Sequence, residues 1–135
     1  MNSYMENNWI RESNNSYPNR LLNSKEGFIK GNMFQDLYNP YKNYQPQDLI
    51  PKTEQEKCLY ELSAVTFAAH ELNLYLDLHP EDQSMFMLFT DYQKKAHRLM
   101  EEYEDKYGPI MVNSKEMNNS FSWAQTNWPW EGKNV

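Results

Sequence analysis

The 135-residue sequence is long enough for one domain, and it combines a mean hydropathy of −0.95 with 15% aromatic residues. Its formal net charge of −6 argues against nucleic acid and against an anionic membrane surface as partners. No apolar run reaches the roughly 18 residues of a transmembrane helix. Residues 1–9 lack the charged and apolar regions of a signal peptide, so export by that route is not expected.

Residues 1–26 are rich in Asn and Ser and show no apolar period. This composition predicts a tail that is disordered or that becomes ordered on a partner.

Residues 27–52 combine prolines with many apolar side chains. Pro40, Pro46 and Pro51 exclude a long helix or a central strand. The apolar residues are too many for a solvated linker: Phe28, Met33, Phe34, Leu37, Tyr38, Tyr41 and Tyr44. We expect an extended arm that packs either on this chain's own helices or on another chain.

Residues 53–108 carry the helical signal. Apolar residues recur at alternating steps of four and three, which places one apolar stripe along each of two helices. The first stripe is Cys58, Leu62, Val65, Ala69, Leu72 and Leu76, and the second is Met85, Phe89, Tyr92, Ala96, Leu99, Tyr103 and Tyr107. A short turn at residues 78–80 makes the helices antiparallel neighbours, so the predicted fold class is an all-α helical hairpin with extended arms at both ends.

The ends of the two helices are also signalled. Thr53 and Glu56 form a capping-box pattern that starts the first helix. Pro80 suits the first position of the second helix. Gly108 predicts a left-handed cap, and Pro109 prevents the helix from resuming.

A second set of apolar residues lies off the stripes: Leu59, Phe67, Leu74, Leu78, Phe86, Leu88 and Met100. Two helices share only one interface, so this set stays uncovered in the hairpin alone. We expect the bundle to be completed by the chain's own aromatic arms, by a second copy, or by another protein.

Residues 109–135 form a second arm, in which a polar linker precedes a cluster of aromatic residues. Phe121, Trp123, Trp128 and Trp130 bring a large apolar area, about 150–250 Å² for each ring. These rings are expected to be buried, on this chain or on a partner.

Metal or catalytic chemistry finds little support. His70, Glu71 and Asp77 are the candidate ligands, but the Glu-x-x-His spacing of a di-metal bundle and the His-Glu-x-x-His motif are both absent. There is no glycine-rich phosphate loop and no nucleophile elbow. Cys58 is interpreted as a small buried hydrophobe, with a reactive thiol or an intermolecular disulfide as the alternative. We therefore predict no enzyme and no cofactor, and a metal-binding bundle or enzyme subunit built across a dimer from His70, Glu71 and Asp77 is the rival interpretation.

Several motifs resemble the CotJB family of bacterial spore coat proteins. They are Leu59-Tyr60-Glu61-Leu62-Ser63-Ala64-Val65, Glu71-Leu72-Asn73-Leu74-Tyr75-Leu76-Asp77-Leu78-His79-Pro80-Glu81-Asp82, Glu102-Tyr103-Glu104-Asp105-Lys106-Tyr107-Gly108-Pro109, and Trp123 with Trp128-Pro129-Trp130-Glu131. The resemblance covers residues 59–131, and the family's Pro-Trp-Pro-Trp is replaced here by Asn127-Trp128-Pro129-Trp130. A shorter segment, residues 31–41, is similar to the CotJA family.

The resemblance implies a spore coat component that is synthesised in the mother cell and whose partner is a coat protein of the manganese-catalase type. It supplies no catalytic residue. We expect a structural or adaptor subunit, with a self-assembling coat block as an alternative. The predicted partner-binding residues lie in the two aromatic arms: Phe34, Leu37, Tyr38, Tyr41, Tyr44, Trp123, Trp128 and Trp130.

Overall fold

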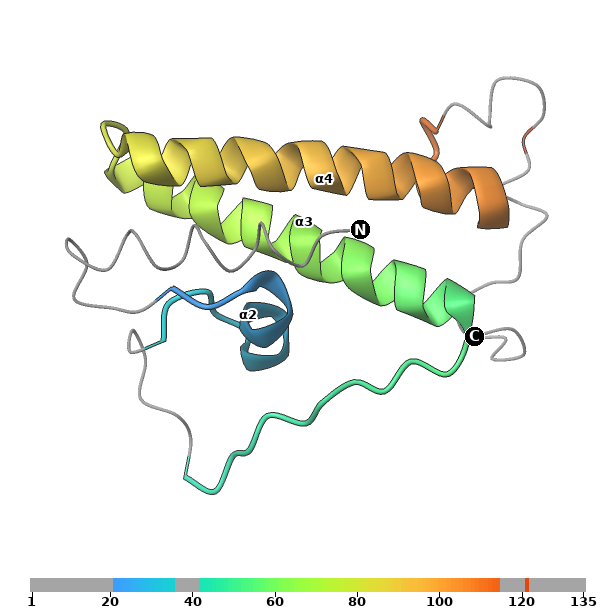
Figure 1. The fold of residues 1–135 in the computed structure, drawn as a ribbon, viewed down its shortest axis with the longest axis horizontal. Coiled ribbons are helices and arrows are strands. Elements are labelled where there is room, and N and C mark those ends of the chain that lie inside the picture. Colours follow the sequence, from blue (N-terminus) through green and yellow to red (C-terminus); the bar gives the residue numbers. More distant parts are fainter. Residues whose placement is uncertain (1–20, 36–41, 115–120, 122–135) are drawn as a thin grey trace.

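The structure of the protein is a computed structural model that describes residues 21–35, 42–114 and 121. Its described part contains three helices, α2 (Ser24–Lys30), α3 (Glu54–Leu78) and α4 (Gln83–Tyr107). α3 and α4 lie side by side and antiparallel, and α2 packs against α3 (Figure 1). The predicted all-α hairpin is therefore confirmed.

α3 begins with the predicted capping box. The Thr53 hydroxyl accepts from the Glu56 N–H at 3.1 Å, and the Glu56 carboxylate accepts from the Thr53 N–H at 3.2 Å. The helix ends where the His79 N–H donates to the Tyr75 carbonyl at 3.1 Å, since Pro80 follows. At 25 residues, each long helix spans about 38 Å.

The start of α4 differs from the prediction, which placed Pro80 at the first helical position. Asp82 is the N-cap, and the helix begins at Gln83. The Asp82 carboxylate accepts from the Met85 N–H at 3.1 Å and from the Ser84 hydroxyl at 2.7 Å. An aspartate that satisfies free N–H groups fixes the start of a helix more firmly than a proline that only has a suitable φ.

The end of α4 also differs in detail. Gly108 has the expected positive φ of 101°, but its ψ of 176° is extended, so the predicted left-handed cap is wrong. Its N–H still donates to the Glu104 carbonyl at 3.0 Å. The Glu104 carboxylate then accepts from the Ile110 N–H at 3.1 Å and bonds to the Ser114 hydroxyl, which turns the chain back along α4.

The core lies between α3 and α4, and its central cluster comes from the two predicted stripes. Met100 packs against this cluster, so its predicted place in the uncovered set is wrong. Leu62 and Val65 of α3 pack with Leu99 and Tyr103 of α4 in one buried cluster. Five partly buried side chains complete it: Cys58, Tyr92, Ala96, Met100 and Ile110. Two polar contacts also join the helices, from Gln55 Nε2 to the Tyr103 hydroxyl at 3.1 Å and from Lys95 to Glu61 at 3.3 Å.

α2 was not indicated by the sequence pattern, which placed residues 21–26 in a polar tail and residues 27–30 in an extended arm. The Asn23 side chain caps this helix by accepting from the Glu26 N–H at 2.9 Å, and Gly31 ends it with a left-handed φ of 77°. Seven residues are too few for an isolated helix to be stable, so its contacts with α3 stabilise it.

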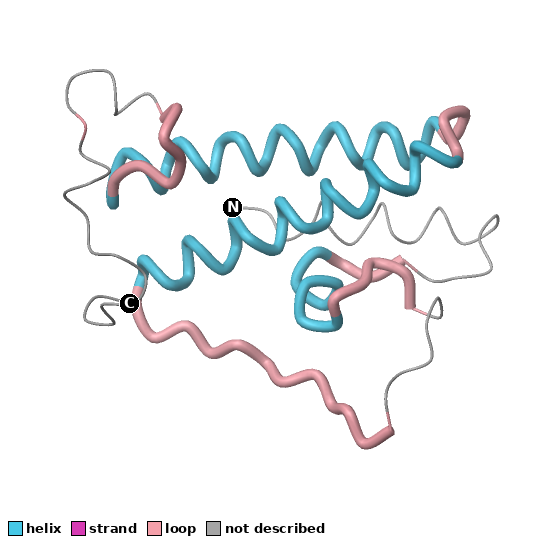
Figure 2. Tube along the Cα trace, turned by 180° about the vertical axis from the view of Figure 1, so that it is seen from behind, coloured by secondary structure: helices cyan, strands magenta, loops and turns pink. Residues whose placement is uncertain are grey.

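Residues 44–52 have neither helix nor strand, which suits the fixed φ and missing N–H groups of Pro46 and Pro51. The segment leads to the start of α3 and stands away from the hairpin when seen from either side (Figures 1 and 2). We call residues 42–52 the arm.

Candidate docking surfaces

The outer face of α3, opposite α4, is occupied by the chain's own residues 21–35. The Phe28 ring lies 5.9 Å from the rings of both Tyr60 and Phe67. The Phe34 ring stacks on Tyr75 at 5.4 Å. This segment therefore covers part of the second apolar set, and Phe34, one of the predicted partner-binding residues, packs on its own chain.

Residues 21–35 are folded back on themselves by a close contact between Gly27 and Met33. Met33 is completely buried, and a Cβ added to Gly27 would lie 2.4 Å from the Met33 sulfur. The Leu22 N–H donates to the Met33 carbonyl at 2.7 Å, and the Met33 N–H points to the Glu71 carboxylate at 3.5 Å. We call this unit the docked segment.

Tyr75 connects the docked segment to the turn of the hairpin. Besides Phe34, its ring lies 4.5 Å from that of His79, and its hydroxyl donates to the Asp82 carboxylate at 3.2 Å. Burial, with a smaller contribution from the charge of Glu81, raises the pKa of the Tyr75 hydroxyl. A tyrosine hydroxyl is already protonated at neutral pH, and the raised pKa of Tyr75 extends to more alkaline solution the range in which it donates to the N-cap of α4.

The arm is the most exposed part of the described chain. Each of residues 42–50 is exposed, including Tyr44, Leu49 and Ile50, and the exposed fraction of Ile50 is 82%. The backbone groups of residues 42–51 form no hydrogen bond to the backbone of another described residue. An exposed extended segment with free N–H and C=O groups can bind another chain.

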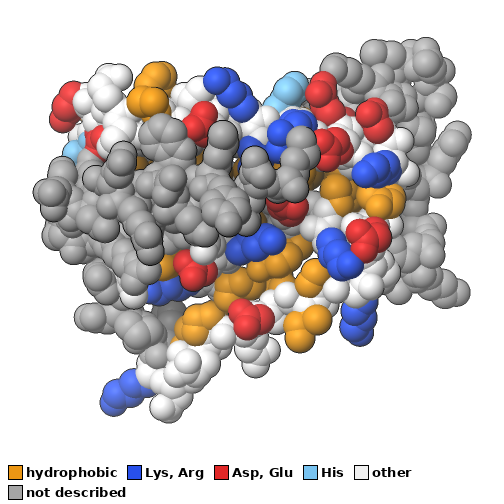
Figure 3. All heavy atoms as spheres, viewed as in Figure 1, with side chains coloured by type: hydrophobic (Ala, Val, Ile, Leu, Met, Phe, Trp, Pro, Cys, Tyr) orange, Lys and Arg blue, Asp and Glu red, His pale blue; other side chains and the backbone are white. Residues whose placement is uncertain are grey.

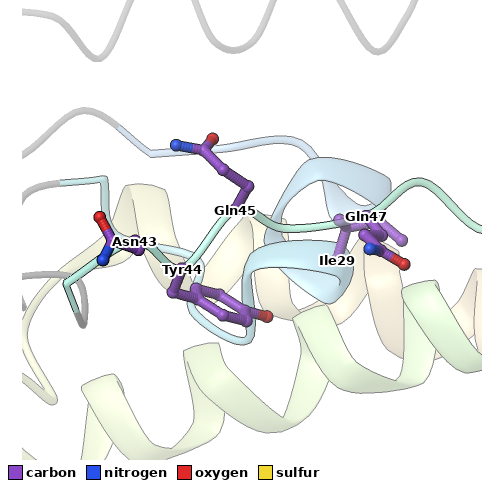
Figure 4. A pocket seen from close by; sticks show the side chains of 5 residues that line it. All are labelled: Ile29, Asn43, Tyr44, Gln45 and Gln47. Carbon is purple, nitrogen blue, oxygen red and sulfur yellow. The ribbon is translucent and has the colours of Figure 1, made fainter.

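Tyr44 lies in a cleft between the arm and α2, lined by Ile29, Asn43, Tyr44, Gln45 and Gln47 (Figure 4). Figure 4 shows the side chains of Tyr44 and Gln45 on opposite sides of the arm, as in an extended chain. The described residues that line the cleft include no charged side chain, so they favour a binding contact over a catalytic site.

Six of the eight predicted partner-binding residues, Leu37, Tyr38, Tyr41, Trp123, Trp128 and Trp130, lie outside the described residues. Leu49 and Ile50 were not among the predicted residues. The sequence did contain a signal for them: two adjacent apolar residues directly before Pro51. A residue before a proline is held extended, which keeps this pair out of a helix.

The candidate metal ligands do not form a site in the described chain. His70 and Asp77 are exposed on α3, and Glu71 faces the docked segment. Among the residues that the structure describes, no three His, Cys, Asp or Glu side chains come together in a way that could hold a metal ion.

Cys58 lies half-buried beside the core cluster. Burial raises the pKa of the Cys58 thiol, and the nearby Lys106 charge lowers it by less. A thiol with a raised pKa holds less thiolate at neutral pH, which disfavours a nucleophilic role.

None of the described helices is both long enough and apolar enough to cross a lipid bilayer. By its fold, the described chain is an antiparallel helical hairpin with a docked segment on α3 and an exposed extended arm before it. The family model described as CotJB protein matches residues 56–131, more than half of the 135 residues. The chain belongs to the CotJB family, and this membership indicates a protein of the bacterial spore coat, in a structural family not known for enzymes. Neither a curated protein nor a solved structure matches the chain significantly.

Proposed function

We propose that this protein is an adaptor of the spore coat that holds a manganese-catalase-like coat protein and other coat proteins through its exposed apolar segments. The mother cell is the proposed place of synthesis. The proposal is supported most directly by the arm: its side chains Leu49 and Ile50 are exposed, and the backbone of residues 42–51 forms no hydrogen bond to the backbone of another described residue. Membership of the CotJB family supplies the coat setting.

The physical reason for a docking role is the cost of exposed apolar surface. Burial of apolar area contributes about 25 cal/mol for each Å², and a fully buried Leu or Ile contributes about 1.5–3 kcal/mol. Leu49 and Ile50 gain only part of this in the described chain, where their exposed fractions are 54% and 82%, and a partner that covered them would add the rest. The aromatic residues of the C-terminal arm, Trp128 and Trp130, are proposed to act in the same way.

Binding of the purified manganese-catalase-like coat protein to the immobilised full chain tests the proposal. Ile50→Ser should weaken binding about tenfold to a hundredfold, because a buried Ile is worth about 1.5–3 kcal/mol. Leu59→Ser is the control for the same loss of an aliphatic side chain outside the arm, at a position on α3 whose exposed fraction is 36%. Trp128→Ala combined with Trp130→Ala should abolish binding while the helical circular dichroism is retained.

If Ile50→Ser and the double Trp variant both bind as tightly as the wild type, neither the arm nor the C-terminal arm belongs to the interface. If the wild-type chain does not bind the catalase-like protein, that protein is not its partner. A self-assembling coat block is the alternative, and it predicts association of the pure chain without any partner.

A further inference from the structure

The excess negative charge of the molecule is confined to one part of the hairpin. Residues 58–93 contain six acidic residues and no Lys or Arg, while the rest of the chain contains 13 acidic and 13 basic residues. The whole formal charge of −6 is therefore carried by most of α3, the turn and the first part of α4. Charge gathered in one region steers the approach of a partner, whereas evenly mixed charge does not.

Three of these six acidic side chains are engaged within the chain. Glu61 pairs with Lys95, Glu71 faces the Met33 N–H, and Asp82 caps α4. The other three, Asp77, Glu81 and Asp91, are exposed, and none of them forms an ion pair with a described residue.

Exposed hydrophobic side chains occur at the same end of the hairpin. The exposed fraction of Leu78, the last residue of α3, is 79%, and about half of Phe86 and of Met87 is exposed in the first turn of α4. Figure 3 shows acidic and hydrophobic side chains along the visible edge of α4 at its turn end, with the first basic ones farther along the helix. We name this end of the hairpin the acidic tip, defined by Asp77, Leu78, Glu81, Phe86, Met87 and Asp91.

Among the described residues, α2 contributes two basic side chains beside α3, and each of them interacts within its own chain. The Lys30 ammonium donates to the Gln35 carbonyl at 2.7 Å, and the Lys25 ammonium lies 6.0 Å over the Tyr60 ring. Neither of them pairs with Asp77 or Glu81, and the first basic side chains of α4, Lys94 and Lys95, come only after Asp91, so within the described chain the turn and the first two turns of α4 carry negative charge alone.

We propose that the acidic tip is a docking surface for a protein that presents apolar side chains flanked by Lys and Arg. Its charges disfavour a second tip, because two copies would bring like charges together, and like charges across an interface cost several kcal/mol. They equally repel phosphate groups of a nucleic acid or a lipid. The inference depends on the proposed function only in that both require a protein partner.

A defined probe tests the tip without any coat protein. The probe is a short amphipathic helical peptide of Leu and Lys, titrated against the full chain. Asp77→Lys combined with Glu81→Lys should weaken its binding roughly tenfold or more and reduce the salt dependence, because attraction becomes repulsion. The matched control is Glu102→Lys combined with Asp105→Lys, which changes the net charge equally at exposed positions near the other end of α4.

The two charge variants distinguish an effect of where the acidic side chains lie from an effect of the net charge of the chain. Weakening by the tip variant alone supports the proposal, and equal weakening by both variants, or a wild-type chain that does not bind the peptide, overturns it. Leu78→Ser with Phe86→Ser should also weaken binding, while Leu59→Ser should not. Circular dichroism of each variant checks that the helices are retained.

Titration with the manganese-catalase-like protein separates this proposal from the proposed function. If that protein binds the wild type and the tip variant equally, the docking role stands and the acidic tip is wrong. If the catalase-like protein binds neither the wild type nor the tip variant, it is not the partner. The peptide titration then tests the acidic tip by itself.

Discussion

At the scale of single residues, three polar side chains cap the described helices. Thr53, Asp82 and Asn23 each accept a hydrogen bond from a backbone N–H in the first turn of a helix. An unsatisfied N–H at a helix end costs stability, so these side chains determine where the helices begin.

Replacing Thr53 by Ala should lower the free energy of unfolding by about 1 kcal/mol, because the Glu56 N–H loses its acceptor and the capping box is broken. Urea denaturation followed by circular dichroism measures this. Thr66→Ala makes the same chemical change at an exposed position inside α3, where Ala favours the helix. Equal losses in the two variants would contradict a capping role for Thr53.

The Cys58 thiol should react slowly with iodoacetamide at neutral pH, because burial raises its pKa. The reaction should accelerate at a higher pH than it does for the same chain unfolded in urea. The sign for stability follows from the same shift: this contribution is fully present below the pKa of the unfolded thiol and decreases as the pH rises through the folded pKa. A folded protein that is alkylated as fast as the unfolded chain would rule out this assignment.

At the scale of elements, the docked segment is the part of the fold that depends most on tertiary contacts. α2 is too short to be stable alone, and it is held by Met33 beneath Gly27 and by rings on α3. The stability of the docked segment therefore depends on the packing between Gly27 and Met33.

Gly27→Ala should weaken this segment, although Ala normally stabilises a helix by about 1 kcal/mol relative to Gly. The added methyl would meet the Met33 sulfur at 2.4 Å, and overpacking of a buried site costs about 1–3 kcal/mol. Faster hydrogen exchange of the Leu22 N–H, which is bonded to the Met33 carbonyl, measures the loss. Adding Met33→Ala removes the clashing atom, so the double variant should cost less than the sum of the two single variants.

The sequence predicted those elements whose signals are local or periodic. The stripes through Leu62 and Leu99 and the capping box at Thr53 were sufficient for the hairpin, because helical periodicity and capping depend on neighbours within a few turns. The docked segment could not be predicted in this way. Its decisive contacts join Phe28 to Phe67 and Met33 to Glu71, over some 40 residues of sequence.

The candidate docking surfaces were predictable only in part, because exposure depends on which apolar residues the fold covers. Phe34 and Ile50 are both apolar residues near a proline-rich stretch, yet Phe34 stacks on Tyr75 and Ile50 is exposed. The acidic tip can be seen as a charge pattern in residues 58–93, but only the fold shows that Leu78, Phe86 and Met87 are left exposed beside it.

At the scale of the whole molecule, the described chain contains two packed layers on α3, one from α4 and one from the docked segment. The buried cluster between α3 and α4 is small, with Leu62, Val65, Leu99 and Tyr103 at its centre. Small domains bury a low fraction of their surface, so each layer is a large part of the total stability.

An isolated fragment of residues 53–108 should therefore be less helical and melt at a lower temperature than the full chain. It loses Phe28, Met33 and Phe34, of which Met33 is buried and the two Phe rings are partly buried. Together their burial contributes about 3–6 kcal/mol. This is comparable to the total stability of a small domain, about 5–15 kcal/mol, so the melting temperature should fall by more than about 10 °C. Circular dichroism melts with size-exclusion chromatography measure helicity and association together, and a fragment of residues 21–114 should recover most of the loss. A monomeric 53–108 fragment as helical and as heat-stable as the full chain would show that the hairpin needs no cover, and the argument that its uncovered apolar faces exist to bind other surfaces would fail with it.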